Sequence, residues 1–312
     1  MDANWPLIGV RFALYGVLGA LFGLSAFALY GLRAGERGNA LALRPWLVVL
    51  ALLGLALSIV ALALLAASMT GTPPWPVDRE AVGMLLSGSA TGAAWKARMA
   101  ALLVAGMIVA VAAGRGAWLG VAVVAAGIAL STLAWTGHGA TGEGVPGWVH
   151  LIAELLHLLA SGAWVGTLLG LVLLVTRPAG RVDAAHLALT HRALQGFGLV
   201  GTMVVSAIVV SGLINSWMLV GIGNVANLGA TLYGRLLAAK LVLFGAMLGL
   251  AWLNRFRLTP IFERSIAATD HRGALRALRA SLAVETACVV VILALVAWLG
   301  TLEPPKVAVM TH

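Results

Sequence analysis

The chain has 312 residues, of which 61% are hydrophobic and only 10% are charged. A soluble domain carries about 25% charged residues, so the composition excludes an ordinary soluble globular protein. The net charge of +9 would suggest a nucleic-acid partner in a soluble protein, but arginine in cytoplasmic loops also orients membrane helices. The single cysteine, Cys288, excludes an intrachain disulfide and a thiolate cluster. The sequence therefore predicts an all-α, polytopic membrane helix bundle.

Eight apolar stretches approach the roughly 20 residues that a helix needs to cross a bilayer. The first of them is too long for the apolar region of a cleavable signal peptide. The spans are expected near residues 7–32, 46–68, 97–113, 117–136, 148–176, 194–217, 232–253 and 277–299. The segment between the second and third spans begins with the sequence TGTPPWP and is expected to be the largest loop. We expect one transmembrane domain, 1–312, with four-helix halves at 1–136 and 148–299 and a periplasmic tail at 300–312.

The distribution of Lys and Arg predicts the orientation. Alternate loops hold thirteen arginines, namely Arg33, Arg37, Arg44, Arg115, Arg177, Arg181, Arg192, Arg255, Arg257, Arg264, Arg272, Arg276 and Arg279. The other side has Arg79, Lys96, Arg98 and Lys306 near its loops. Cytoplasmic loops carry the excess of positive charge, so both termini are expected outside the cytoplasm.

Short similarities suggest that the two halves form a parallel internal repeat, related by an axis along the membrane normal. The sequence SATGAAWKAR before the third span resembles TLYGRLLAAK at the seventh, and LGALFG in the first span resembles SGAWVG in the fifth. These alignments pair Ser89 with Thr231, Gly92 with Gly234, Arg98 with Lys240, and Arg11 with Glu154.

The fifth span carries three ionisable side chains, His150, Glu154 and His157. A charge at mid-membrane costs about 2.5 kcal/mol or more, so such residues need a reason. Their spacing of four and then three residues puts all three on one helical face. His150 and His157 lie roughly 10 Å apart along the axis, too far to bind the same ion readily. We expect each to recruit ligands from other helices, or the three to form successive steps of a path.

Copper is the ion that the neighbouring residues favour, because imidazole binds copper, zinc, iron and nickel, whereas thioether sulfur selects Cu(I). The loop TGHGATGEGVPGW before the fifth span adds His138 as a fourth candidate ligand and also contains Glu143. Further candidate contacts expected on the outer side are Met218, Met69, Met310 and His312. Whether copper binds as Cu(I) or Cu(II) is open.

A purely structural interpretation stays open for each group. His150 could be hydrated at the interface, Glu154 could form an ion pair with Arg11, Arg98 or Lys240, and His157 could bind a helix carbonyl. The buried charges Lys240 and Glu285 would then be an ion pair between the last two spans, whereas the functional interpretation is a proton or ion path. His186, His191 and His271 fall in arginine-rich loops and are expected to be solvated.

The segment SGLINSWMLVGIGNVANLGATLYGR, which starts at Ser211, breaks into Gly and Asn between two spans. It could form a short re-entrant lid that carries Asn215 and Met218. No phosphate-binding loop and no soluble domain are apparent, so nothing suggests nucleotide hydrolysis and no enzyme activity is expected.

At these residues the chain resembles the CopD family of bacterial copper-resistance and copper-uptake inner-membrane proteins. The resemblance lies in HLLASGAWVGTLLGL, SGLINSWMLV and TLYGRLLAAKLVL, and the eight-span plan extends it to the whole chain. Thr167 stands where the family motif more often has the second glycine of Trp-x-Gly-Gly, and Leu232 replaces the proline of Thr-Pro-Tyr-Gly-Arg. Neither change touches a candidate ligand.

The resemblance implies copper movement across the cytoplasmic membrane, inward from the periplasm, and a periplasmic copper-carrier partner of the CopC type. Two other classes stay open from the residues. One is a b-type haem electron carrier, in which His157 would need a histidine partner across the bundle, with His138 as the only mate. The other is a copper sensor or scaffold that binds outside and transports nothing.

Overall fold

The computed structural model describes residues 4–37, 41–111, 116–136, 144–178, 182–221, 223, 228–267 and 272–304. These ranges are almost entirely helical, without a strand, and contain eight helices long and apolar enough to cross a membrane. The first four spans are α1 (Trp5–Tyr30), α2 (Leu43–Thr70), α4 (Ala90–Val111) and α5 (Gly116–Ser131), the last continued by the 3₁₀ turn η1 (Thr132–Thr136). The other four are α6 (Gly144–Val175), α7 (Ala184–Val220), α8 (Leu232–Leu253) and α10 (Arg272–Leu299). The expected polytopic all-α fold with eight spans is confirmed.

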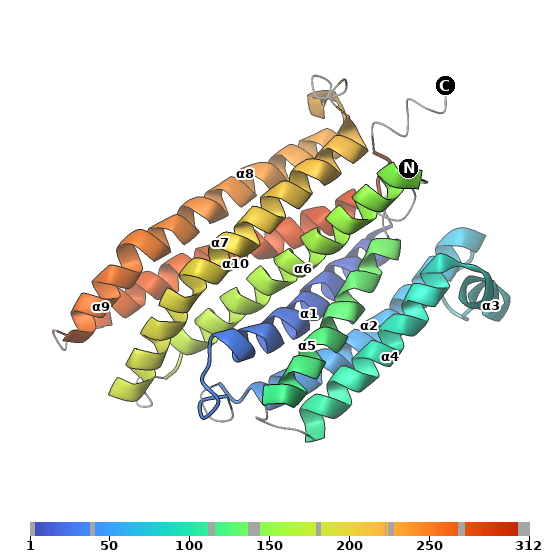
Figure 1. The fold of residues 1–312 in the computed structure, drawn as a ribbon. Coiled ribbons are helices and arrows are strands. Elements are labelled where there is room, and N and C mark those ends of the chain that lie inside the picture. Colours follow the sequence, from blue (N-terminus) through green and yellow to red (C-terminus); the bar gives the residue numbers. More distant parts are fainter. Residues whose placement is uncertain are drawn as a thin grey trace.

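Helices α1 and α6 form the middle of the bundle, and they pack closely on each other. The remaining helices of the first half, α2, α4 and α5, lie on one side, and α7, α8 and α10 lie on the other (Figure 1). The rings of Trp5 and Trp298 approach to 5.3 Å between centroids, so α1 begins where α10 ends. We name this end of the bundle the outer end and the opposite end the inner end.

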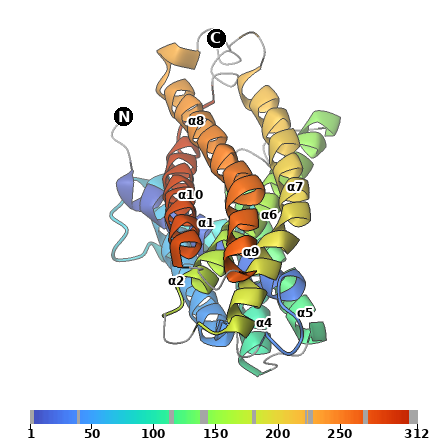
Figure 2. The same ribbon diagram turned by 90° about the vertical axis from the view of Figure 1, so that its left-hand side faces the viewer.

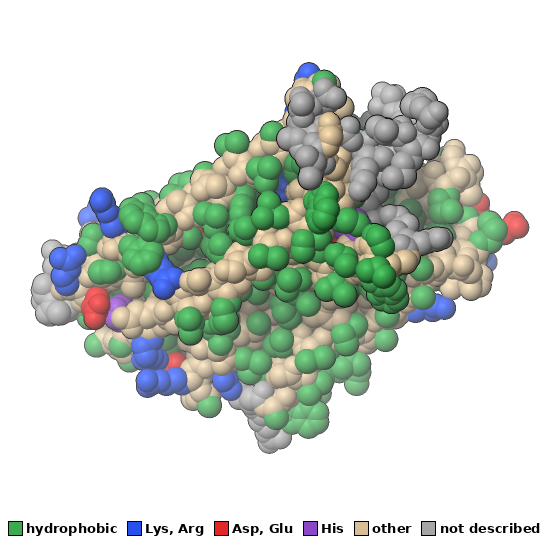
Figure 3. Space-filling view, turned by 45° about the horizontal axis from the view of Figure 1, so that its top comes forward, with side chains coloured by type: hydrophobic (Ala, Val, Ile, Leu, Met, Phe, Trp, Pro, Cys, Tyr) green, Lys and Arg blue, Asp and Glu red, His purple; other side chains and the backbone are tan. Residues whose placement is uncertain are grey.

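Arginine side chains gather at the inner end, at the left of the space-filling view, while the middle of the surface is apolar (Figure 3). Several of them bind the carbonyl groups that a helix leaves unpaired at its last turn. Arg37 donates to the carbonyl oxygens of Ala28 and Leu29 at 2.9 Å, and Arg279 donates to that of Val175 at 2.5 Å. The arginines therefore satisfy carbonyl groups at the ends of helices. Their positive charge also marks the side that the positive-inside rule assigns to the cytoplasm.

Glycines allow α1 and α6 to cross at backbone contact. A Cβ added to Gly23 would lie 2.0 Å from the carbonyl oxygen of Gly162, and one added to Gly166 would lie 2.0 Å from the carbonyl carbon of Gly23. Gly19 faces Gly162 in the same way, with an added Cβ 3.6 Å from its Cα. These are the glycines that the alignment of LGALFG with SGAWVG pairs, so the helices of the two halves meet at equivalent residues.

The starts of α4 and α8 are also alike. The hydroxyl of Ser89 accepts a hydrogen bond from the amide of Gly92 at 2.9 Å, and Thr231 caps Gly234 at 3.1 Å. An added Cβ would lie 2.0 Å from the Leu85 carbonyl oxygen at Gly92, and 1.9 Å from that of Leu228 at Gly234. Both helices have 22 residues. The halves differ in one packing: α2 lies closely against α4, whereas α7 and α8 diverge.

Three expectations about local structure were wrong. The segment between α2 and α4 contains a further helix, α3 (Arg79–Gly88), which the Asp78 carboxylate caps by accepting from two amides at 3.0 Å. Helix α7 begins well before residue 194, so Arg192 lies within it. The proposed re-entrant lid is absent from the described part of that segment, because α7 continues without a break to Val220. Ser216 donates to the carbonyl oxygen of Gly212, four residues back, which leaves the helix intact.

The inner end of α8 continues into η4 (Asn254–Leu258), a single π-helical turn, and then into α9 (Thr259–Ala267). Figure 2 looks onto the bundle from the side that carries α9. The wider turn is stabilised by the hydroxyl of Thr259, which donates to the carbonyl oxygen of Asn254, five residues back, at 2.8 Å. Such single π turns occur frequently at functional sites, and this one turns the side chain of Asn254 into the bundle.

Candidate ion-binding site

The three ionisable residues of the fifth span lie on α6 and face the interior of the bundle rather than lipid. His150 is buried, with 5% of its surface exposed, and Glu154 and His157 are partly buried. The residues that touch Glu154 and His157 come from α7, which runs antiparallel to α6 and packs closely on it.

Glu154 is contacted from three other helices. The amide nitrogen of Asn215 donates to its Oε2 at 2.8 Å, and the carboxylate interacts electrostatically with Lys240 of α8 and Arg11 of α1. The side-chain oxygen of Asn215 is buried and accepts no hydrogen bond from any described residue. The expected charge partners Lys240 and Arg11 thus face Glu154. The third, Arg98, does not.

His157 is held in a defined tautomer by Ser211. Its Nδ1 lies 3.0 Å from the Ser211 hydroxyl oxygen, and that hydroxyl donates its own proton to the carbonyl oxygen of Ala207 at 2.5 Å. The proton on the shared bond therefore belongs to Nδ1, which leaves Nε2 as the nitrogen with a free lone pair. Gly212 flanks the ring, because a Cβ there would lie 3.5 Å from its Cε1.

The contacts between α6 and α7 form a ladder along the membrane normal. His157 pairs with Ser211, and Glu154 pairs with Asn215 one turn nearer the outer end. The next residue on this face of α7 is Met218, three positions further on. Because the helices are antiparallel, the register puts Met218 at the level of His150. From the outer end inward, the ladder therefore offers the imidazole and thioether of these two residues, then the Glu154 carboxylate, then the His157 imidazole.

Among the residues that the structure describes, no three His, Cys, Asp or Glu side chains converge closely enough to hold a metal ion. His150, Glu154 and His157 therefore do not form one coordination sphere by themselves. The candidates His138, Met310 and His312 lie outside the described residues. Met69 lies at the outer end of α2, on the other half of the bundle, with 67% of its surface exposed.

The expected ion pair between Lys240 and Glu285 does not form. Lys240 interacts with Glu154 in the outer half of the bundle. Glu285 accepts a hydrogen bond at 3.1 Å from the amide nitrogen of Asn254, which is the first residue after α8. Asn254 is fourteen residues beyond Lys240, a rise of roughly 20 Å, so the two charges lie at different depths.

Arg98 also proved to have a different environment from the one expected. It lies in α4 with 1% of its surface exposed, and its Nε donates to the Thr132 hydroxyl at 2.8 Å. It therefore joins α4 to η1 within the first half and takes no part in the network around Glu154. Arg11 lies near the outer end, where an added Cβ on Gly300 would be 2.5 Å from its guanidinium.

Sequence reasoning missed several partners. Ser211 and Tyr233 were not singled out, although the hydroxyl of Ser211 contacts His157 and Tyr233 interacts electrostatically with Glu154. Asn215 was noted only as part of the lid. The four-residue spacing of Ser211 and Asn215 on an apolar helix was the available signal. The expectation for His186 was wrong, since it is 5% exposed and its Nε2 lies 2.9 Å from the Leu174 carbonyl oxygen.

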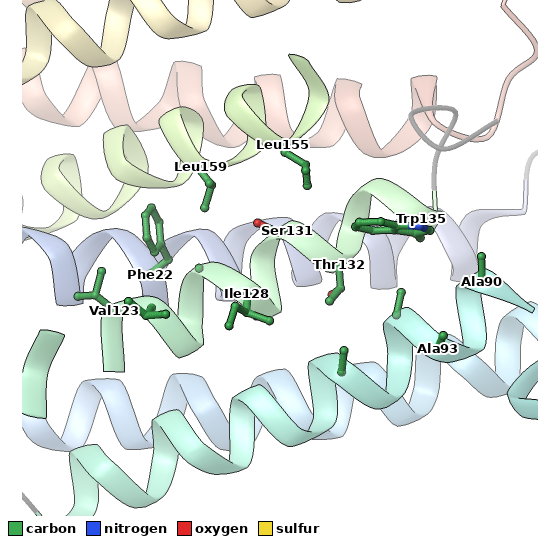
Figure 4. Close-up of a pocket in the computed structure, with 14 residues that line it drawn as sticks. Phe22, Ala90, Ala93, Val123, Ile128, Ser131, Thr132, Trp135, Leu155 and Leu159 are labelled. Atoms are coloured by element: carbon green, nitrogen blue, oxygen red, sulfur yellow. The ribbon is translucent and has the colours of Figure 1, made fainter. Parts of the chain in front are cut away.

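A separate cavity of about 690 Å³ lies elsewhere, between α4, α5 and α6 (Figure 4). Its lining is apolar apart from the side chains of Ser131, Thr132 and Trp135, and it contains no ionisable residue. A cation would find no compensating charge there, so this cavity is not part of the candidate site.

The fold and the site together define a polytopic helical membrane protein with a carboxylate and histidines buried between its helices. A family model described as copper resistance protein D-like, N-terminal domain, matches residues 1–148, and one described as copper resistance protein D matches residues 191–299. A protein of Pseudomonas syringae pv. tomato named copper resistance protein D is 42% identical over 307 residues, which cover 97% of this chain and 98% of the relative. The chain belongs to the copper resistance protein D family. No solved structure matches it.

Proposed function

We propose that this protein carries copper ions inward across the bacterial inner membrane, along the ladder between α6 and α7. The observation that carries the proposal is the pairing of Glu154 with Asn215 and of His157 with Ser211 inside the outer half of the bundle. Ionisable residues placed within a membrane bundle mark an ion pathway by default. The proposed activity is transport without covalent chemistry.

The donor types along the ladder suit copper. His150 and Met218 at the outer rung offer imidazole and thioether, the ligands that copper prefers. Nearer the inner end, the Glu154 carboxylate offers negative charge. Asn215 offers a side-chain oxygen that accepts no hydrogen bond from the described residues, and His157 offers its Nε2 nitrogen. Copper would pass from His150 to the pair formed by Glu154 and His157, because nitrogen ligands bind at about 2 Å and one ion cannot span both histidines.

Lys240 supplies the counter-charge for Glu154 in the resting protein. A copper ion that reaches Glu154 brings its own positive charge and competes with the ammonium group for the same carboxylate. Neutralising the carboxylate either way avoids an unpaired buried charge, which would be strongly unfavourable. The site can therefore exchange one cation for another without leaving Glu154 uncompensated.

Copper accumulation in proteoliposomes, normalised to inserted protein, tests the proposal. His157→Ala should abolish uptake while some copper still binds at the surface, and His150→Ala should mainly weaken capture at low copper. The matched control is His191→Ala, because His191 lies on α7 at the inner end, 3.6 Å from the exposed Glu263. Full uptake by the triple variant His150→Ala, Glu154→Ala, His157→Ala would refute the route.

A periplasmic copper carrier of the CopC type would deliver the ion to the outer end. We infer this partner from the family, and the outer position of His150 and Met218 suits such a transfer. Uptake from the carrier loaded with copper should be faster than from free copper at the same total concentration. An equal rate would argue against the partnership.

The two alternatives make different predictions. A b-type haem needs two histidines facing each other across the bundle, but the described residues offer His157 no histidine at its own depth. A Soret band in the purified protein would favour haem. A sensor or scaffold would bind copper on the outer side and show no accumulation inside the vesicles.

A further inference from the structure

A second polar site lies in the inner half of the same bundle, below the ladder. It is a cavity of about 310 Å³ between α6, α7, the inner end of α8 and α10. Apart from the indoles of Trp164 and Trp252, its polar lining consists of Glu285, Asn254, Arg255, Thr202, Ser206 and Thr259. The cavity exists because α7 and α8 diverge, whereas the corresponding helices α2 and α4 of the first half close on each other.

Glu285 is the buried charge of this cavity. Only 2% of its surface is exposed, it accepts a hydrogen bond from the Asn254 amide nitrogen at 3.1 Å, and the Trp164 side chain also interacts with it. The side-chain oxygen of Asn254 is buried and unpaired among the described residues, so the amide has turned its donor toward the carboxyl group. A carboxylate here has no cation against it, and an isolated ion in such a place would be neutralised.

The other charged groups around Glu285 are few. Arg255 is the only other ionisable side chain in the lining, and it is exposed at the mouth, where it donates to Thr202 at 2.6 Å and stacks on the ring of Phe256. Helices α6 and α7 contribute no ionisable residue to the cavity. Helix α1, which also packs on α10, carries Arg11 only near its outer end.

Helices α6 and α7 contribute to both sites, and on α6 the same face lines both. On α6 the cavity is lined by Trp164, seven residues or roughly 10 Å below His157. On α7 it is lined by Val205 and Ser206, six and five residues before Ser211 and nearer the inner end. Glu285 therefore lies along the continuation of the ladder toward the inner end.

The donor set distinguishes a proton from copper. The polar side-chain atoms of the lining are oxygens of carboxyl, amide and hydroxyl groups, together with the donor nitrogens of Arg255, Asn254 and the indoles of Trp164 and Trp252. Soft copper prefers sulfur and imidazole, and neither is present in this lining. We propose that Glu285 binds and releases a proton during each transport cycle and so couples copper movement to the proton gradient. This inference rests on the proposed transport of copper.

Proteoliposomes with and without a pH gradient test the coupling. If one proton moves per copper ion, copper accumulation in the wild-type protein should change about tenfold per pH unit of gradient. Glu285→Gln keeps the shape of the side chain but cannot exchange a proton, so its accumulation should be the same with and without the gradient. Glu285→Asp should retain the dependence, and Glu80→Gln, on the exposed helix α3, is the matched control.

A second measurement does not depend on copper. Infrared difference spectra between two pH values should show the C=O stretch of a protonated carboxyl group, and this band should be missing in Glu285→Gln. Wild-type accumulation that ignores the pH gradient, or a band that persists in Glu285→Gln, would overturn the proton inference and leave copper transport standing. A wild-type protein that accumulates no copper would overturn the transport proposal itself, and the coupling with it.

Discussion

Ser211 does not touch a copper ion in the proposed route, but it orients the residue that does. Its hydroxyl donates to the backbone and accepts from Nδ1 of His157, so Nε2 faces the path as a ligand. Removing a group that orients a metal-binding histidine typically costs 10- to 100-fold in affinity. Ser211→Ala should therefore weaken copper binding by roughly that factor.

The affinity is measured by competition with a copper chelator in detergent. Ser216→Ala is the matched control, because Ser216 lies on the same helix and its hydroxyl donates to the Gly212 carbonyl oxygen. Equal copper affinities for the two variants would show that the tautomer of His157 is set by something other than Ser211.

Glu154 and Lys240 should be energetically coupled, because each is the other's charge partner in the outer half of the bundle. Lys240→Met leaves a carboxylate without its cation, and Glu154→Gln leaves an ammonium group without its anion. The double variant should be less destabilised than the sum of the single changes, by about 0.5–3 kcal/mol. Thermal unfolding in detergent measures the cycle. Additive effects would mean that Arg11 alone balances Glu154.

The ion pair of Glu36 and Arg192 should make stability depend on pH at the inner end. Partial burial raises the pKa of Glu36, but hydrogen bonds from the Arg33 amide at 2.9 Å and from Arg192, with the charge of both arginines, outweigh it and bring the pKa below its ordinary value of 4.5. A depressed pKa gives stability that is present above the unfolded pKa and lost as the pH falls through the folded one.

The melting temperature should consequently fall between neutral pH and pH values below 4.5, and Glu36→Gln should remove part of that fall. The measurement is a series of melting curves at constant ionic strength. The control is Glu80→Gln, whose carboxylate is exposed at the outer end on α3. Identical pH profiles for Glu36→Gln and wild type would contradict the prediction.

At the scale of the helices, the close crossing of α1 and α6 requires glycine, which has no side chain, at the residues where the two backbones touch. An alanine at Gly166 would put its Cβ 2.0 Å from the backbone of Gly23, which cannot move without separating the two central helices. Overpacking of this kind costs about 1–3 kcal/mol, and more where backbone must shift. Gly166→Ala should lower the melting temperature and the folded yield.

Gly16→Ala is the control for this change, because Gly16 lies on α1 and an added Cβ there meets no atom within 4 Å. Replacing glycine by alanine in an open helix position should be neutral or stabilising. A stable Gly166→Ala variant would mean that α1 and α6 do not cross as closely as these residues require.

The helices show what a single sequence can and cannot predict. Apolar length predicted all eight spans, because a bilayer demands it. Helix α3 and the long inner ends of α7 and α10 lie beyond the apolar stretches, where hydropathy carries no signal. The lid was inferred from the Gly and Asn residues between two spans, but Asn215 and Met218, which it was expected to carry, lie within α7, and Asn215 bonds to Glu154. Which helix supplies a partner is a tertiary fact that spacing alone does not contain.

At the scale of the whole molecule, the internal repeat expected from the sequence would account for a site that occurs once. The offset that superposes Gly23 on Gly166 puts Leu7, Arg11 and Leu14 where the second half has His150, Glu154 and His157. In the first half α2 and α4 close on each other, and in the second half α7 and α8 diverge to leave the inner cavity. The three ionisable residues of α6 and their hydrogen-bond partners on α7 therefore lie in the second half. The sequence predicted the three α6 residues from their cost in a membrane, but not the inner role of Asn254 with Glu285.

The orientation of the bundle can be tested on the intact membrane. The arginine-rich inner end should face the cytoplasm, and α3 should face the other side. Cys288 is the only cysteine, so Cys288→Ala provides a background for single cysteines. In that background Glu80→Cys on α3 should react with a membrane-impermeant maleimide in spheroplasts, where the outer face of the inner membrane is open to the reagent. Glu263→Cys on α9 should react only after the membrane is permeabilised, since its side chain is 60% exposed but lies at the inner end.

In the reverse pattern, Glu263→Cys would react in intact spheroplasts and Glu80→Cys only after permeabilisation. That result would place His150 on the cytoplasmic side and reverse the proposed direction of copper transport. Labelling of both cysteines before permeabilisation would mean that α3 and α9 lie on the same side, which an odd number of spans between them forbids. Helices α4, α5, α6, α7 and α8 lie between the two positions. The two cysteines therefore test the span count and the orientation in one experiment, and the direction of the proposed copper route depends on the result.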